Sequence, residues 1–344
     1  MDSYRRSFLK GVGTIGAAAA IGGLSSVNAE TKPAGPQKKG MAKGLTLLTL
    51  RHNGEYRLGV KTEKGILDVK QAAETLHLGA PHTMDDLLQN EDGPALNALV
   101  DAAMKSAAVQ KGLLKEGTIT YGPLVTRPEK IVCVGLNYRK HAAEINLPVP
   151  KQPVLFNKYN NALLHHTGTI KLPAVAKKFD YEIELVIVMG KEARDVSEKD
   201  ALSYVAGYAT GNDFSARDLQ IEAGGQWMVG KTSDGFAPLG PYFITAEQVN
   251  PDNLNLECRV NGETRQSSNT NDLVFNCSQI ISYTSARISL RPGDIIYTGT
   301  PGGVIFNGAV NGVATRKEKW DWLKAGDKIA CSIEKLGELK FDLA

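Results

Sequence analysis

The sequence predicts an α+β protein that is mainly β, with a mixed β-roll or sandwich as its main body and a small α+β domain before it. Three observations predict this class. Short apolar runs with strand spacing recur beyond Leu256, turn signals such as Asn261-Gly262 and Pro292-Gly293 separate them, and few segments have helical spacing. The 344 residues, 42% hydrophobic and 22% charged, are enough to bury a full core.

Residues 1–29 are interpreted as a twin-arginine signal peptide and set apart from the fold. Arg5 and Arg6 begin the sequence RRSFLK, a weakly apolar run follows, and Val27-Asn28-Ala29 offers a small-x-small cleavage site. The run is shorter than the ~20 residues of a membrane-spanning helix. We therefore expect an exported, periplasmic protein with no membrane contact in its mature form, and a disordered or anchoring N-terminus is the alternative. Residues 30–44, rich in Pro, Gly and Lys, are expected to form a tether.

The small α+β domain is expected over residues 45–121. Its first part has strand-like runs, and Asn53-Gly54 is a two-residue hairpin turn. Residues 84–110 carry apolar residues at helical spacing, and Thr83 stands where a helix cap belongs. Nothing in this domain suggests chemistry.

The β-roll body is expected over residues 128–344. A short buried strand at 130–134 opens it, and a hairpin over Leu336-Gly337 closes it. In between, a helix of about ten residues is expected to begin at Ser197 and end at Gly207.

Net charge and cysteine spacing argue against a nucleic-acid partner and against disulfide bonds. The net charge is only +3 and no basic block occurs, so nothing points to a nucleic-acid partner. The cysteines lie far apart without a CxxC pair, which favours buried free thiols over disulfides. They are Cys133, Cys258, Cys277 and Cys331.

Two carboxylates stand in the segment that begins at Asp180, which has the pattern of a strand. Because side chains in a strand alternate with a period of two, Glu182 and Glu184 project from the same face. Adjacent like charges on one face repel each other. Either the pair lies at a solvated strand end, or it holds a cation.

A histidine and a glutamate follow the strand at 130–134. If residues 139–146 form a helical turn, His141 and Glu144 are i, i+3 neighbours. A carboxylate beside an imidazole raises its proton affinity, which makes the pair a candidate general base. An exposed helical ion pair is the alternative that the local sequence leaves open.

Residues 225–232 fit the phosphate-loop pattern GxxxxGK[ST]. That loop works only where a helix starts at the lysine. Two glycines and two prolines within residues 233–241 argue against such a helix, so nucleotide binding is not favoured. Lys231 is left as a lone cation in a glycine-rich loop.

Asp213 adds a third carboxylate to Glu182 and Glu184. The three offer oxygen donors without a cysteine or an obvious histidine partner. Hard oxygen ligands suit Mg²⁺ or Mn²⁺, with Ca²⁺ also possible, rather than zinc or copper. Three protein ligands would leave positions for water and a bidentate substrate.

From about Pro128 to its end, the chain resembles the fumarylacetoacetate hydrolase family. No single piece is specific, but together and in order they are. The matching pieces are Gly135-Leu136-Asn137-Tyr138 with His141 and Glu144, Phe156-Asn157-Lys158, Tyr181 to Leu185, Asn212 to Gln220, Gln226-Trp227 with Gly230-Lys231, Pro238 to Pro241, and Pro292 to Pro301.

This resemblance implies a mixed β-roll, a homodimer, and Mg²⁺ or Mn²⁺ held by Glu182, Glu184 and Asp213. In similar proteins the metal chelates the carboxylate and keto oxygens of a 2-oxo acid. Lys231 would neutralise charge that develops on the substrate, and His141 with Glu144 would form a base dyad on a short lid helix. Tyr138, Arg217, Gln220 and Thr300 are the predicted substrate contacts.

The function expected from these residues is a metal-dependent hydrolase that cleaves a C–C bond in a 2,4-dioxo acid through a metal-bound enolate. An isomerase or decarboxylase of 2-oxo acids on the same site is the close alternative. A catalytically silent binding protein is a third possibility, although binding alone needs no base. The segment after Lys158 and residues 302–307 depart from the family pattern, so the substrate is left open.

Overall fold

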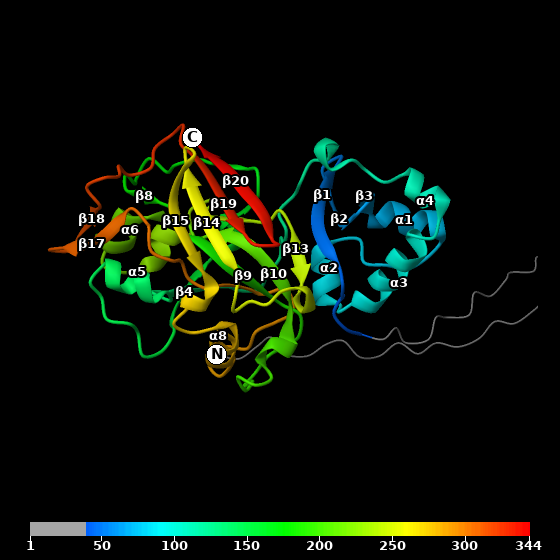
Figure 1. Cartoon of the computed structure of the whole chain (residues 1–344), viewed down its shortest axis with the longest axis horizontal. Helices are drawn as coiled ribbons and strands as arrows, with labels where there is room; N and C mark the ends of the chain where they lie inside the picture. The colour runs from blue at the N-terminus through cyan, green and yellow to red at the C-terminus, as the bar shows by residue number, and fades with distance from the viewer. Residues whose placement is uncertain (1–38) are drawn as a thin grey trace, which may run out of the picture. The chain divides into compact units, whose positions relative to one another are not determined.

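The computed structural model describes residues 39–344, and a mixed sheet of eleven strands forms its centre (Figure 1). The main path runs in the order β3-β2-β1-β13-β10-β9-β16-β4-β5, and β12 and β6 join beside β10. The bounds are β1 Thr46–His52, β2 Glu55–Thr62, β3 Gly65–Asp68, β4 Ile131–Gly135, β5 Val154–Lys158, β6 Leu163–His165, β9 Ile183–Met189, β10 Val205–Asn212, β12 Ala237–Leu239, β13 Phe243–Thr245 and β16 Ile295–Tyr297.

The N-terminal strands extend this sheet, because β1 pairs with β13. Asn53 and Gly54 both have positive φ, as the predicted two-residue turn between β1 and β2 requires. The helical spacing after Thr83 forms three helices, and Thr83 caps the first of them. The helices of this part are α1 Val69–Leu76, α2 Met84–Gln89, α3 Gly93–Ala103 and α4 Ala107–Lys111.

Only the end of the predicted tether falls within the described residues. Gly40 already belongs to the folded unit, since its N–H donates to Glu91 (2.7 Å) and its carbonyl accepts from Gly93 (3.0 Å). The predicted twin-arginine signal over residues 1–29 lies outside the described residues.

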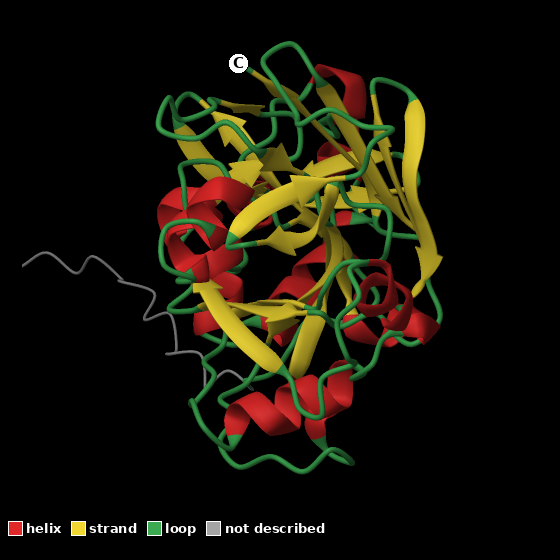
Figure 2. Ribbon diagram, turned by 90° about the vertical axis from the view of Figure 1, so that its left-hand side faces the viewer, coloured by secondary structure: helices red, strands yellow, loops and turns green. Residues whose placement is uncertain are grey.

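A second sheet of five strands, in the order β15-β14-β19-β20-β7, carries the predicted hairpin over Leu336-Gly337. Strands dominate the whole (Figure 2), so the α+β, mainly β fold class is confirmed. The bounds are β7 Thr169–Ile170, β14 Asn255–Val260, β15 Glu263–Asn269, β19 Lys328–Ile333 and β20 Gly337–Leu343; short pairs are β8 Phe179–Asp180 with β11 Ser215–Ala216 and β17 Phe306–Val310 with β18 Val313–Arg316. The remaining helices are α5 Arg139–Glu144, α6 Arg217–Ile221, α7 Trp227–Lys231 and α8 Cys277–Ser285.

The helix predicted from Ser197 to Gly207 is wrong. A single 3₁₀ turn covers Ala201–Tyr204, and the chain then enters β10. Every residue of β10 is buried, and the strand pairs with β9 along most of its length. Because both faces of β10 are buried, its sequence lacks the polar–apolar alternation that marks a half-exposed strand, and only the tertiary setting identifies it.

The four cysteines are buried free thiols, as predicted. Two of them, Cys258 and Cys331, face each other across β14 and β19 with their Sγ atoms 3.5 Å apart. Within residues 39–344, no helix has both the length and the apolar character needed to cross a membrane.

Candidate active site

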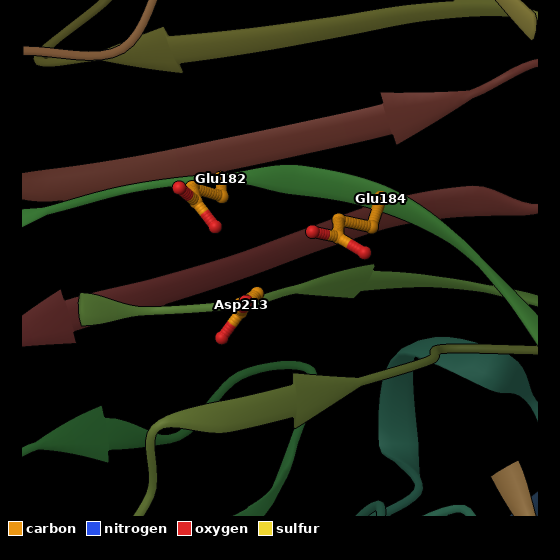
Figure 3. A group of neighbouring side chains, drawn as sticks. All are labelled: Glu182, Glu184 and Asp213. Atoms are coloured by element: carbon orange, nitrogen blue, oxygen red, sulfur yellow. The ribbon is translucent and has the colours of Figure 1, made fainter. Parts of the chain in front are cut away.

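The three predicted metal ligands meet where β9 begins and β10 ends. These strands are antiparallel, with Ile183 opposite Asn212, and the Asp213 N–H donates to the Glu182 carbonyl (2.8 Å). Glu182, Glu184 and Asp213 therefore converge, with one ligand oxygen from each lying within 4.8 Å of the others (Figure 3). All three are at most 5% exposed, which rules out a solvated strand end. The prediction that Glu182 and Glu184 share a face is confirmed.

The cationic side chains around this cluster do not contact its three carboxylates equally. Lys231 Nζ donates to Glu182 Oε2 (2.7 Å) and to Asp213 Oδ2 (2.8 Å), and Arg217 Nη2 donates to Glu182 Oε1 (2.6 Å). Glu184 accepts the Gly299 N–H (2.6 Å) and forms no ion pair with a described residue. One carboxylate is thus left with unmatched charge.

The pKa shifts follow this imbalance. Burial, then the charges of Asp213 and Glu182, raise the pKa of Glu184 well above its ordinary value. Burial also acts to raise the pKa of Glu182, but the charges of Arg217 and Lys231 outweigh it and lower that pKa to about 2. Burial acts to lower the pKa of Lys231, yet Asp213 and Glu182 raise it.

Asp213 Oδ1 is a buried acceptor with free lone pairs. It forms a buried ion pair with Lys158 Nζ (2.6 Å), which also donates to the carbonyls of Phe214 (3.1 Å), Phe236 (2.9 Å) and Lys231. A carboxylate oxygen can accept more than one contact, so this ion pair leaves Asp213 able to bind a cation as well. Free lone pairs on Asp213 and unmatched charge on Glu184 are what a cation needs, so the three carboxylates fit a metal ion.

Lys158 and Asp180 are site residues that the sequence analysis missed. Asp180 is fully buried and accepts from Arg217 Nε (2.9 Å) and Nη2 (2.8 Å), as well as from the amides of Ile305 and Phe306. Arg217 Nη1 also donates to Gln220 Oε1 (2.9 Å). Lys158 ends β5 inside a family-like segment, and Asp180 ends β8 directly before the family-like segment that begins at Tyr181, which was the available signal.

Thr300 is held at the cavity wall by a hydrogen-bond chain. Its hydroxyl donates to the Ile183 carbonyl (2.9 Å) and accepts from Gln266 Nε2 (2.8 Å). Gln266 Oε1 in turn accepts the Ile183 N–H (3.0 Å). This chain links Thr300 to the first residue of β9, next to both glutamates.

The predicted helical turn carrying His141 and Glu144 is confirmed as α5. His141 Nδ1 lies 3.8 Å from Glu144 Oε2, which is longer than a hydrogen bond, and this nitrogen is buried without a partner. Glu144 instead accepts the Gly303 N–H (2.9 Å) and pairs with Lys317. Burial alone would raise the pKa of Glu144, but its contacts with His141, Lys317 and Gly303 lower it to about 2.

Lys231 ends a helix instead of beginning one. Helix α7 spans Trp227–Lys231, inside the pattern that resembled a phosphate loop. Its N-terminus therefore points away from the lysine, which is the reverse of a nucleotide-binding loop. This turn brings the ammonium of Lys231 into the carboxylate cluster.

A cavity of about 500 Å³ opens over the cluster. The predicted site residues that line it are His141, Glu182, Glu184, Arg217, Gln220, Lys231 and Thr300. Asp213 and Glu144 do not belong to this lining. Tyr138 differs from its predicted role as a substrate contact: it is fully buried, does not line the cavity, and forms a backbone bridge with Leu273 just before α5.

Comparisons with known proteins agree with this fold. The sequence profile described as fumarylacetoacetate (FAA) hydrolase C-terminal matches residues 130–344. The chain is 42% identical over 275 residues to the mitochondrial oxaloacetate tautomerase FAHD2A of Bos taurus, covering 79% of this chain and 82% of that protein.

Two solved structures share the fold. A protein from Mycobacterium smegmatis described as HpcE has a TM-score of 0.70 and 34% identity, covering 87% of this chain and 99% of that one. The fumarylacetoacetate hydrolase of Exiguobacterium antarcticum has a TM-score of 0.69 and 28% identity, with the same coverage. The fold and these relatives define an enzyme of the class that acts on 2-oxo acids. This chain belongs to the fumarylacetoacetate hydrolase family.

Proposed function

We propose that the protein is a metal-dependent hydrolase that cleaves the C–C bond between C3 and C4 of a 2,4-dioxo acid. The observation that carries this proposal is that His141, which has a buried ring nitrogen without a hydrogen-bond partner, lines the same cavity as Lys231, Glu182 and Glu184. Glu182, Glu184 and Asp213 would hold Mg²⁺ or Mn²⁺, with Ca²⁺ a further candidate. Such an ion, when bound, withdraws charge from the carboxylate and 2-keto oxygens of the substrate.

The chain's own residues account for the proton transfers. His141 takes a proton from water, and the resulting hydroxide attacks the C4 carbonyl. The C3–C4 bond then breaks, giving a carboxylic acid and the enolate of pyruvate, and the imidazolium returns its proton to C3. Lys231 stabilises the negative charge that develops on the enolate oxygen. Arg217, Gln220 and Thr300 orient the substrate from the cavity wall.

An isomerase, tautomerase or decarboxylase on the same site is the second candidate. The observation that favours it is the 42% identity to a protein named as an oxaloacetate tautomerase. The same base would then move a proton between C3 and the 2-keto oxygen without cleaving a bond to an acyl group. Both candidates need His141, so the products distinguish them.

A panel of acylpyruvates and oxaloacetate, assayed with Mg²⁺ and with Mn²⁺ and followed by product mass, tests the proposal. We expect metal-dependent formation of pyruvate and a carboxylic acid, with loss of turnover in His141→Gln. His165→Gln, which changes a histidine outside the cavity, is the control. Keto–enol exchange without cleavage would replace the leading candidate by the second, and binding without turnover would contradict both.

Export and assembly are further parts of the proposal. The RRSFLK sequence and the Val27-Asn28-Ala29 cleavage site support export by the twin-arginine route. Cell fractionation of the full chain should place it in the periplasm, and changing Arg5 and Arg6 to lysine should retain it in the cytoplasm. A homodimer is proposed from the family resemblance, and sedimentation of the purified protein at a monomer's mass would contradict it.

A further inference from the structure

Beyond the predicted site residues, the cavity is lined mainly by apolar side chains, with Asn146 and Asn307 among them. The apolar side chains include Leu147, Phe156, Ile221, Trp227, Phe306 and Val310. Leu147 is 46% and Val310 61% exposed, so these two lie at the mouth. The apolar side chains therefore form a surface that faces whatever extends from the reacting end of a substrate.

An aromatic pair forms the wall nearest the reacting end. The rings of Phe156 and Trp227 lie edge to face, with centroids 5.3 Å apart. Lys231 Nζ lies 5.2 Å from the Phe156 centroid, so this wall begins directly beside the lysine of the cluster. A Cβ on Gly135 would lie 2.5 Å from the Trp227 ring, and the glycine thus lets the indole pack against the end of β4. The wall is held in place by packing before any ligand binds.

The cationic side chains that line the cavity already form ion pairs with carboxylates of the protein. Among the described residues that line the cavity, the lysine and arginine side chains are Lys231 and Arg217. Lys231 donates to Glu182 and Asp213, and Arg217 donates to carboxylates and to Gln220. A second carboxylate at the far end of a substrate would lose water against the apolar wall without gaining an uncommitted lysine or arginine from the described lining.

We propose that the substrate carries an uncharged, apolar group, aryl or extended alkyl, at the end away from its 2-oxo acid. Within the proposed function, this selects acylpyruvates with an apolar acyl group over dicarboxylates. The inference rests on that function, because it assumes that the 2-oxo acid end binds at the cluster. Phe156 and Trp227 are then residues that determine specificity.

Calorimetric binding of three ligands in Mg²⁺ tests the inference without turnover. The ligands are 2-oxo-4-phenylbutanoate, 2-oxobutanoate and 2-oxoglutarate, and none of them has the 4-oxo group that the proposed cleavage needs. Burial of apolar area contributes about fourfold in affinity per methylene, so the phenyl ligand should bind at least about tenfold more tightly than the other two. Equal or tighter binding of 2-oxoglutarate would overturn the inference alone. No binding of any of the three would overturn the proposed function and the inference with it.

Surface variants provide a second, independent test. Leu147→Arg and Val310→Arg each add a cation at the mouth, and both positions are exposed enough to accept it without loss of folding. We expect tighter binding of 2-oxoglutarate by about fivefold to tenfold and weaker binding of the phenyl ligand. Val175→Arg, at a position 78% exposed that does not line the cavity, is the matched control. Identical ligand preferences in the wild type and both mouth variants would contradict the proposed location of the substrate tail.

Discussion

Lys231 Nζ lies 2.7 Å from Glu182 Oε2, inside the carboxylate cluster that also fits a metal ion. The same ammonium reaches Asp213 Oδ2, so two of the three carboxylates share one lysine. Glu184, the third, is stabilised by a backbone amide. The effects of substitution should therefore differ sharply within this one site.

Glu184→Gln should stabilise the metal-free protein. Because the pKa of Glu184 is raised in the folded state, ionising it favours unfolding as the pH rises above the ordinary carboxyl range. The neutral amide removes that penalty, and we expect the melting temperature at pH 7 to rise by about 2–4 °C, the shift that about 1 kcal/mol produces in larger domains. Thermal unfolding in the presence of a chelator measures this.

The same variant should lose its response to metal. In the wild type, Mg²⁺ at 100 times its dissociation constant should add about 2.7 kcal/mol of stability, whereas Glu184→Gln should show little shift. Equal Mg²⁺-induced shifts in the two proteins would show that Glu184 is not a metal ligand.

Lys231→Met should separate chemistry from metal binding. Loss of the ammonium removes charge stabilisation next to the substrate, so kcat should fall by about 10²–10³-fold at saturating Mg²⁺. The cluster becomes more negative, and Mg²⁺ should bind at least as tightly as in the wild type. Steady-state kinetics and metal titration by calorimetry check the two parts. A variant with unchanged kcat would remove Lys231 from the proposed catalytic set.

Lys317 should affect the protonation of the proposed base, His141, through its ion pair with Glu144. Lys317 is paired with Glu144, and the nearby His141 nitrogen has no partner. In Lys317→Met, the uncompensated Glu144 carboxylate favours the protonated imidazole, so the acidic limb of the kcat/KM profile should move to higher pH.

Lys319→Met, which removes a neighbouring exposed lysine, is the control and should keep the wild-type profile. A Lys317→Met enzyme with lower activity but an unshifted profile would mean that Lys317 supports the local structure only.

His166 should contribute to acid sensitivity. Burial, then the charge of His165, lower the pKa of His166 from 6.5 to about 4, and its ring lies edge-on to Tyr121 (4.2 Å). Because the folded pKa is depressed, the stability associated with the neutral ring is full above about pH 6.5 and is lost as the pH falls towards 4. His166→Gln should therefore lose less melting temperature between these pH values than the wild type does.

His52→Gln, at an exposed position, should follow the wild-type curve in the same thermal scans. If His166→Gln followed that curve too, the buried histidine would not contribute to the acid transition.

Local periodicity predicted much of the site. The period of two placed Glu182 and Glu184 on one face, and helical spacing paired His141 with Glu144. Lys158, Asp180 and Lys317 were not predicted as site residues, because their roles depend on segments that meet only in the folded protein. The same limit explains the error at residues 197–207, since the chain leaves a 3₁₀ turn at Tyr204 and enters β10, a strand that is defined by its pairing with β9.

The sequence by itself determined the family, the fold class, and the oxygen-donor character of the cluster, because these depend on residue types and short spacings. Only the tertiary structure decided the distribution of charge. Antiparallel pairing of β9 with β10 brings Asp213 to Glu182, and the end of α7 places Lys231 between those two carboxylates. The packing of Phe156 and Trp227 beside that lysine then forms the apolar wall. Such proximity arises from strand order and side-chain packing, which no local pattern encodes.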